Sequence, residues 1–235
     1  MKSYPDLEDV YLEIGSKKTF ACAIDWPGWS RSARDETGAL VSLLDYGARY
    51  ACALEGTELA FRPPVDVVAF VVAERLKGDA STDFGAPGAV PDADRRSVDE
   101  AELDRFRAVL EACWQAFDAA AAAADGKDLR RGPRGGGRDQ AKIVEHVLGA
   151  DAAYLSSVGW KLKTAGDDDS GDQLKRTRQA ILDALDALVG GELPTRGPRG
   201  GVYWPPRYFV RRVAWHVLDH AWEIEDRVTG DGASP

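Results

Sequence analysis

The residues of this chain best suited to chemistry are its three histidines, because their positions allow all three to bind one metal ion. His216 and His220 are four residues apart in VRRVAWHVLDHAWEIEDR, and His146 lies in DQAKIVEHVLGADAAYL. Residues four apart on a helix share one face, with Cβ atoms roughly 5–6 Å apart. A third imidazole from another helix completes three nitrogen ligands and leaves positions open for water or substrate, as in catalytic zinc sites.

The histidines lie on mainly apolar helix faces. Phe209 and Val213 precede the His216 pair at helical spacing, and Ile143 precedes His146 in the same way. An imidazole in a core needs partners for both ring nitrogens, and a shared ion provides a partner for one nitrogen of each ring. The alternative is an ordinary set of histidines, each satisfied by its own hydrogen bonds. We expect one divalent cation, zinc, nickel or iron(II), because imidazole suits all three.

Glu223 is the candidate catalytic residue, three positions past His220 on the same face. Its carboxylate could act as a fourth ligand, accept a hydrogen bond from an imidazole, or serve as a general base. A solvated helix glutamate is the alternative. Three neutral imidazoles leave the ion dipositive, which favours deprotonation of a bound water or thiol. Cys113 could face this site, or pack in the core as such cysteines usually do.

The sequence RGPRGG occurs twice, at 131–136 and 196–201, and each copy leads into a histidine-bearing helix. Arginines and free amides near the start of a helix suit carboxylate or phosphate groups. The alternatives are a flexible loop without a ligand and pairing with an acidic surface of a partner chain. The candidates for binding an acidic cofactor or substrate are the arginines of both copies, Arg131, Arg134, Arg196 and Arg199.

Composition and charge narrow the class of protein. Hydrophobic residues make up 44% and charged residues 29% of the 235 residues, as in ordinary globular proteins. The net charge of −9 argues against a nucleic-acid partner. The opening MKSYPDLED lacks the apolar core of a signal peptide, and no apolar run is long enough for a membrane span. The three scattered cysteines indicate a reducing, cytoplasmic location, with Cys22 and Cys52 expected to be buried.

The hydrophobic period changes along the chain, which predicts an α+β protein with two domains. Residues 1–77 predict a small α/β domain with strands at 10–14 and 19–24, one helix within 35–53, and a strand at 65–76 buried on both faces.

A Gly-, Pro- and Asp-rich linker or covering loop at 78–96 precedes the second domain. Residues 97–230 predict a four-helix bundle, because apolar residues recur there at helical spacing. The helix starts are predicted at capping boxes beginning at Ser97 and Ser170, near Asp139, and at Pro205-Pro206.

This second part resembles the DinB/YfiT-like metalloproteins. The resemblance rests on the histidine in EHVLGADAAYL, the HxxxH pair in HVLDH and the helix order, and it covers about three-fifths of the chain. It implies a bundle that holds a divalent ion through His146, His216 and His220. It also implies kinship with transferases and isomerases that use mycothiol, bacillithiol or glutathione. Related sulfoxide synthases carry an acidic residue two positions after HxxxH, where this chain has Trp222.

The N-terminal part resembles the HicB-like antitoxin fold. The matching residues are TFACAIDWPGWSRSARDETGALVSLLDYGARYA at 19–51, a strand, a Pro-Gly turn, a serine and a helix. Such domains commonly bind a protein partner. The DNA-binding segment that often accompanies them is missing here, so the resemblance implies the fold only.

Two functions fit these features. The first is a metal-dependent transferase or isomerase that acts on a small-molecule substrate with a low-molecular-weight thiol. The second is a non-catalytic, metal-stabilised interaction module that binds a protein partner, or forms a homodimer, through its N-terminal domain. An open three-ligand site favours catalysis, and a closed site that includes Glu223 or Cys113 favours a structural ion.

Overall fold

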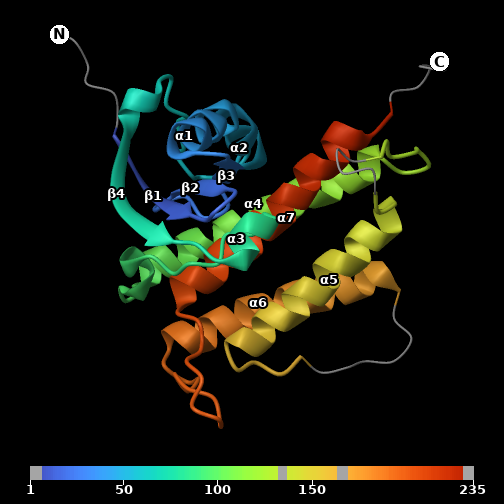
Figure 1. The fold of residues 1–235 in the computed structure, drawn as a ribbon. Coiled ribbons are helices and arrows are strands. Elements are labelled where there is room, and N and C mark those ends of the chain that lie inside the picture. Colours follow the sequence, from blue (N-terminus) through green and yellow to red (C-terminus); the bar gives the residue numbers. More distant parts are fainter. Residues whose placement is uncertain (1–6, 132–136, 163–168, 230–235) are drawn as a thin grey trace. The chain divides into compact units, whose positions relative to one another are not determined.

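The computed structural model describes residues 7–131, 137–162 and 169–229. The chain divides into two compact units, residues 1–97 and 98–235. The fold is mixed α+β: the first unit holds a small four-stranded sheet, and the described part of the second is dominated by long helices (Figure 1).

The sheet of the first unit has the strand order β3-β2-β1-β4. The first three strands form an antiparallel meander, in which Leu12 lies opposite Ala21. The fourth strand pairs parallel with the first, so the chain must cross over between them. The crossover carries two helices and a 3-10 turn. The bounds of these elements are β1 Glu8–Ile14, β2 Thr19–Ala23, β3 Ser30–Ala33, α1 Glu36–Asp45, α2 Gly47–Ala53, η1 Val67–Ala69 and β4 Phe70–Lys77.

Trp29 is central to the core of the first unit. Its side chain is fully buried and its Nε1 donates to the carbonyl of Leu43 in α1 at 2.9 Å. The ring stacks on Tyr50 of α2 with centroids 6.0 Å apart. The Tyr50 hydroxyl in turn donates to the carbonyl of Pro27 at 2.8 Å. The turn that precedes β3 is therefore tied to both crossover helices.

The helix predicted within 35–53 is two helices, because the chain breaks at Tyr46 and Gly47. Glycine is a poor helix former, and a Cβ added at Gly47 would lie 2.9 Å from the Cβ of Pro63. This close approach requires the glycine that weakens the helix. The prediction that Cys52 is buried is also wrong, because its thiol is exposed on α2, whereas Cys22 is buried as expected.

The strand predicted at 65–76 begins only at Phe70, and its predicted burial on both faces is wrong. β4 lies at the edge of the sheet, and the exposed fraction of Val71 is 40%. Val65 precedes the strand and is 93% exposed. An apolar run therefore does not establish burial when the strand has only one neighbour. The sequence does not predict β3, because Ser30–Ala33 lacks apolar alternation.

Residues 78–96 belong to the first unit and contain α3 (Ala80–Phe84) and the 3-10 turn η2 (Asp92–Arg95). Their backbone covers the end of β1. The buried carboxylate of Glu13 accepts hydrogen bonds from the amides of Gly88 and Ala89 at 2.9 Å and from the Thr82 hydroxyl. These bonds satisfy a charge that would otherwise be costly to bury.

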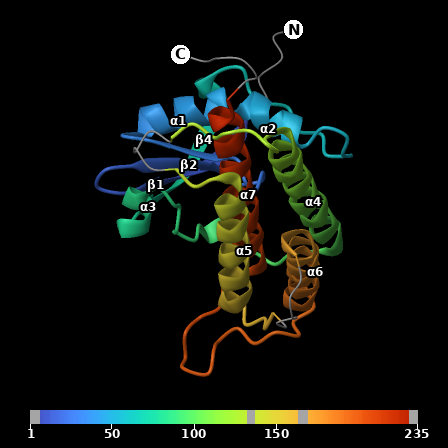
Figure 2. The ribbon, with the colours of Figure 1, turned by 90° about the vertical axis from the view of Figure 1, so that its right-hand side faces the viewer.

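Four long helices are described in the second unit: α4 Glu100–Ala123, α5 Gln140–Ser157, α6 Ser170–Val189 and α7 Pro206–Arg227. α4 packs against α7, and α5 packs against both α6 and α7. Figure 2 shows α5 and α7 side by side. None of the described helices is long and apolar enough to cross a membrane.

Aspartates begin three of these helices. Asp99 accepts from the amide of Glu102, and Asp169 accepts from the amide of Asp172, each at 2.9 Å. The capping boxes predicted at Ser97 and Ser170 are therefore misplaced, by two residues and one residue, because the nearby aspartates provide the capping oxygens. The starts predicted near Asp139 and at Pro205-Pro206 are confirmed.

α5 and α7 run antiparallel. At one end the amide of Arg130, which precedes α5, donates to the carbonyl of Arg227 at 2.8 Å. At the other end the amide of Trp204, which precedes α7, donates to the carbonyl of Ser157 at 3.0 Å. This antiparallel pairing places His146 of α5 beside the middle of α7.

Candidate metal centre

The three histidines form one cluster between α5 and α7. A ligand atom from each of His146, His216 and His220 lies within 4.8 Å of one from each of the others. The ring centroids are 4.7 to 5.0 Å apart, and His220 is nearly perpendicular to both other rings. The i, i+4 spacing places two rings on one face of α7, and the antiparallel α5 supplies the third.

The spacing of the imidazole nitrogens suits a common metal ion. The Nε2 atoms of His146 and His216 are 3.3 Å apart. Two bonds of about 2.0–2.1 Å that meet near the tetrahedral angle place their nitrogens about 3.3 Å apart. Among the described residues, no carboxylate or thiolate joins the three histidines in this group. The residues present thus fit an ion with three nitrogen ligands and a remaining position for a small molecule.

Glu223 orients His220. Its Oε2 lies 2.8 Å from the Nδ1 of His220. The hydrogen bond with His220 is the main cause that lowers the pKa of Glu223, and the guanidinium of Arg227 adds to it. Because the ionised carboxylate can only accept, Nδ1 must donate, and the lone pair of His220 is left on Nε2. Ligating histidines are commonly fixed by a carboxylate in this way.

Arg227 connects this pair to the segment before α5. One guanidinium nitrogen, Nη1, contacts the second oxygen of Glu223. The other two, Nε and Nη2, donate to the carbonyls of Arg130 and Arg138, each at 2.8 Å. The side chain of Arg227 is buried, with 6% exposed. One residue therefore holds both the support of His220 and the two chain ends that flank residues 131–137.

The electrostatic environment keeps two of the rings neutral. Burial lowers the pKa of His146, and it holds the pKa of His216 well below its ordinary value. The positive charge of a neighbouring protonated histidine or of Arg138 acts in the same direction. Neutral imidazole is the form that binds metal. The buried Nδ1 of His216 has no hydrogen-bond partner among the described residues.

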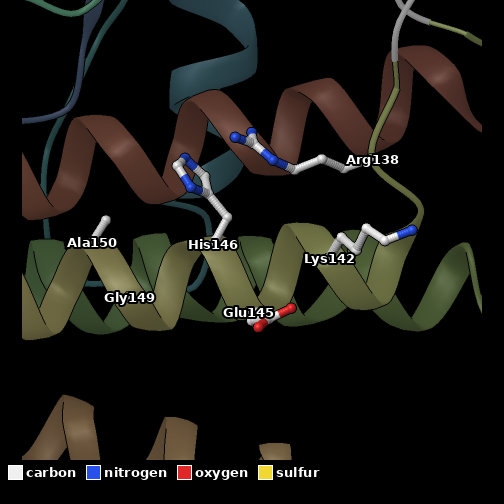
Figure 3. Close-up of a pocket in the computed structure, with 6 residues that line it drawn as sticks. All are labelled: Arg138, Lys142, Glu145, His146, Gly149 and Ala150. Atoms are coloured by element: carbon white, nitrogen blue, oxygen red, sulfur yellow. The ribbon is translucent and has the colours of Figure 1, made fainter.

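A cavity opens beside His146, the most accessible of the three rings (Figure 3). Its volume is about 410 Å³. Figure 3 shows Arg138 extending along α5 toward the His146 ring, whereas Glu145 points to the other side of the helix. The residues that line the cavity are Arg138, Lys142, Glu145, His146, Gly149 and Ala150.

The arginines of the two RGPRGG copies do not gather at one place. Arg131 is exposed near the end of α7, and Arg134 lies outside the described residues. The second copy precedes α7, whose 22 residues span roughly 33 Å. Arg131 therefore cannot share one small anion with Arg196 or Arg199.

The second copy of RGPRGG forms a turn of its own before α7. The guanidinium of Arg196 donates to the carbonyl of Gly200 at 3.0 Å. Arg199 lines a separate cavity of about 530 Å³ together with Tyr203 and Trp204. Trp204 packs on Tyr154 with centroids 5.4 Å apart, and Tyr154 packs on His216 at 5.7 Å. Aromatic packing thus connects this turn to the histidine cluster.

One other candidate, Cys113, lies outside the histidine group. Cys113 is fully buried in α4, and burial raises the pKa of its thiol, as expected for a core cysteine. Arg138 and Arg227 were not candidates from the sequence, because neither belongs to the histidine pattern. The i, i+4 spacing of Glu223 and Arg227 is the sequence signal that links Arg227 to the support of His220.

No protein-family model, curated protein or solved structure matches the chain significantly.

Proposed function

We propose that the protein is a divalent-metal-dependent transferase or isomerase that uses a low-molecular-weight thiol. The observation that carries this proposal is the histidine cluster, whose three ligand atoms lie within 4.8 Å of one another beside an accessible cavity. The ion would be held by His146, His216 and His220. We further propose that residues 97–230 are a DinB-like four-helix bundle and that residues 1–77 are a HicB-like domain.

The histidine cluster is open on one side. His216 and His220 are each 7% exposed, whereas His146 is half-buried at the cavity. Glu223 bonds to His220 and Arg227, so its oxygens already have partners within the protein. A site with three protein ligands and an accessible remaining position is typical of catalytic metals.

When bound, a dipositive ion favours the thiolate of a cofactor over the thiol. The chain then has three tasks: the imidazoles hold the ion, Glu223 fixes the ring of His220, and the cavity beside His146 admits the electrophile. In a transfer to a haloarene, a carbon–sulfur bond forms and the carbon–halogen bond breaks. The proton from the thiol and the halide both leave to solvent.

The first test is metal content together with single substitutions. Purified protein should carry about one zinc, nickel or iron per chain by elemental analysis. His216→Ala or His220→Ala should reduce this content sharply, because each removes one of three ligands. Glu145→Gln is the control. Glu145 precedes His146 but points to the other side of α5, so this substitution should leave the metal content unchanged. Full retention of metal in the double His216→Ala/His220→Ala variant would exclude this centre.

The second test is the reaction. Metal-loaded protein should conjugate a haloarene such as 1-chloro-2,4-dinitrobenzene to mycothiol, bacillithiol or glutathione faster than the His146→Ala variant does. All three thiols have to be assayed, because organisms differ in the one they make. Equal rates for the two proteins with every thiol would favour the non-catalytic interaction module instead.

A further inference from the structure

We propose that the cavity beside His146 is a carboxylate-binding subsite, in which the guanidinium of Arg138 binds a carboxylate of the molecule that reacts at the metal. This inference rests on the proposed function, since it concerns the same centre. It narrows the substrate class to organic acids, with the carboxylate on either the thiol or the electrophile.

The backbone at Arg138 is held firmly. Its carbonyl accepts a hydrogen bond from Nη2 of the buried Arg227 at 2.8 Å. The preceding residue, Gly137, approaches the same nitrogen so closely that an added Cβ would lie 2.4 Å from it. The Arg138 side chain therefore starts from a fixed point, through the arginine that also contacts Glu223.

The guanidinium of Arg138 is directed at the metal centre. Figure 3 shows it reaching along α5 toward the imidazole of His146. Arg138 and His146 line the same cavity. Among the described residues Arg138 forms no salt bridge with any carboxylate, so none of them supplies an anionic partner for its charge.

Lys142 lines the same cavity and carries the same charge, but it is engaged elsewhere. Its Nζ lies 2.6 Å from Oδ2 of Asp139. In Figure 3 its side chain turns back toward the start of α5, away from His146. The two cations of the cavity thus differ in direction and in partner, which makes Lys142 the matched control for Arg138.

The remaining wall of the cavity leaves room for a ligand. Gly149 and Ala150 present almost no side chain, and a Cβ added at Gly149 would meet nothing within 4 Å. The volume of about 410 Å³ is in the range of small-molecule sites. A guanidinium can bind both carboxylate oxygens at once through two parallel hydrogen bonds, which adds orientation to affinity.

The first arm of the test measures binding rather than turnover, in full-length protein loaded with cobalt(II). The probes are 3- and 4-mercaptobenzoate and the matching uncharged mercaptobenzyl alcohols. In the two acids, the rigid ring prevents the carboxylate from binding the same metal ion as the sulfur. The sulfur-to-cobalt charge-transfer band reports each dissociation constant. Wild type should bind at least one acid about tenfold more tightly than its alcohol, as expected for a charge-assisted hydrogen bond. Arg138→Gln should abolish this preference, and Lys142→Gln should keep it.

The second arm asks whether the electrophile carries the acid. With a neutral thiol, wild type should prefer 4-chloro-3,5-dinitrobenzoate to the corresponding benzamide in kcat/KM, and Arg138→Gln should lose that preference. An Arg138-dependent preference in either arm supports the subsite and identifies the molecule that bears the carboxylate. Its absence from both arms, with the charge-transfer band present, overturns the subsite alone. Failure of wild type to bind cobalt, or to show the band with any thiol, overturns the proposed function and this inference together.

Discussion

The Nδ1 of His220 donates to the carboxylate of Glu223, which also accepts a hydrogen bond from Arg227. The remaining ring nitrogen of His220, Nε2, is therefore oriented without a metal ion. His216 has no such support, because its Nδ1 is buried without a described partner. The three ligands therefore differ in preorganisation, and His220 is the one whose orientation depends on a single identifiable residue.

Glu223→Gln should weaken metal binding about 10- to 100-fold, the usual effect of removing a carboxylate that supports a ligating histidine. The amide keeps the size of the side chain but loses the negative charge that favours the required tautomer. Competition with a chromophoric chelator measures the change. Glu225→Gln, at an exposed position two residues further on, serves as the control. Equal affinities for both variants and wild type would show that Glu223 does not act through His220.

Asp151 is a buried acid on α5 that has no part in the proposed chemistry. Its side chain is 1% exposed, and its Oδ1 has no hydrogen-bond partner among the described residues. Burial raises its pKa to about 7, against the opposing charge of Arg178 on α6. Arg178 is itself held by Asp118 of α4 through two bonds of 2.7 Å. The folded state therefore binds the Asp151 proton more tightly than the unfolded chain does.

Asp151→Asn should consequently remove a pH dependence of stability. The contribution of Asp151 is fully present below the unfolded pKa near 3.8 and is lost as pH rises through about 7. The loss is on the order of 4 kcal/mol. The variant should thus be more stable than wild type at pH 8, and nearly equal to it at pH 4. Urea unfolding at pH 4 and pH 8 measures this difference in stability, with Asp125→Asn at an exposed position as the control. An Asp151→Asn variant less stable than wild type at pH 8 would contradict the prediction.

At the scale of elements, the four long helices could be predicted because each carries a long apolar face at helical spacing, as from Leu103 to Phe117 in α4. The first two strands could be predicted for the same kind of reason. What could not be predicted depends on contacts between distant segments. The break at Gly47 depends on Pro63, and the exposure of β4 depends on its place at the sheet edge.

The candidate site shows the same division. Helical spacing alone brings His216 and His220 together, and their proximity to His146 follows from the antiparallel pairing of α5 and α7. The role of Arg227 could not be foreseen, because its partners include two backbone carbonyls, and a carbonyl is common to every residue. Arg138 is directed by that same contact, so no sequence pattern singles it out.

Arg227→Lys tests the junction between α7 and the start of α5. A lysine keeps the charge but lacks the planar fork that contacts three acceptors at once. The free energy of unfolding should fall by about 2–3 kcal/mol, because the hydrogen bonds of a buried, charged guanidinium to part-buried acceptors are lost. Hydrogen exchange at the amide of Arg130, which bonds to the carbonyl of Arg227, should accelerate. Arg199→Lys, near the other end of α7, should change neither quantity, and an unchanged exchange rate in Arg227→Lys would contradict the proposed junction.

At the scale of the whole molecule, each unit has an apolar core that needs no ion. The second unit buries Phe106, Val147, Ile181 and Phe209, one from each long helix, at 2% exposure or less. The first is built around Trp29 and Tyr50. The histidine cluster is thus an addition to a core that is built from apolar side chains.

Removing metal with EDTA should therefore leave the helical far-UV circular dichroism signal essentially intact. The midpoint of thermal unfolding should fall, because an ion that binds only the folded state at about 100 times its Kd adds roughly 2.7 kcal/mol. Returning zinc should restore the midpoint in wild type and fail to do so in His216→Ala. Collapse of the helical signal on chelation would instead identify a structural ion.

Both chain ends that flank residues 131–137 bond to the same guanidinium, so the distance between them is set by Arg227 and is independent of the chain between them. Doubling the length of such a segment costs only about 0.6 kcal/mol in closure entropy. Gly137 has to stay a glycine because of its close approach to Arg227, but the chain before it can lengthen or accept a grafted peptide while the imidazoles keep their geometry. An inserted reporter sequence there would sit next to the centre without being part of it.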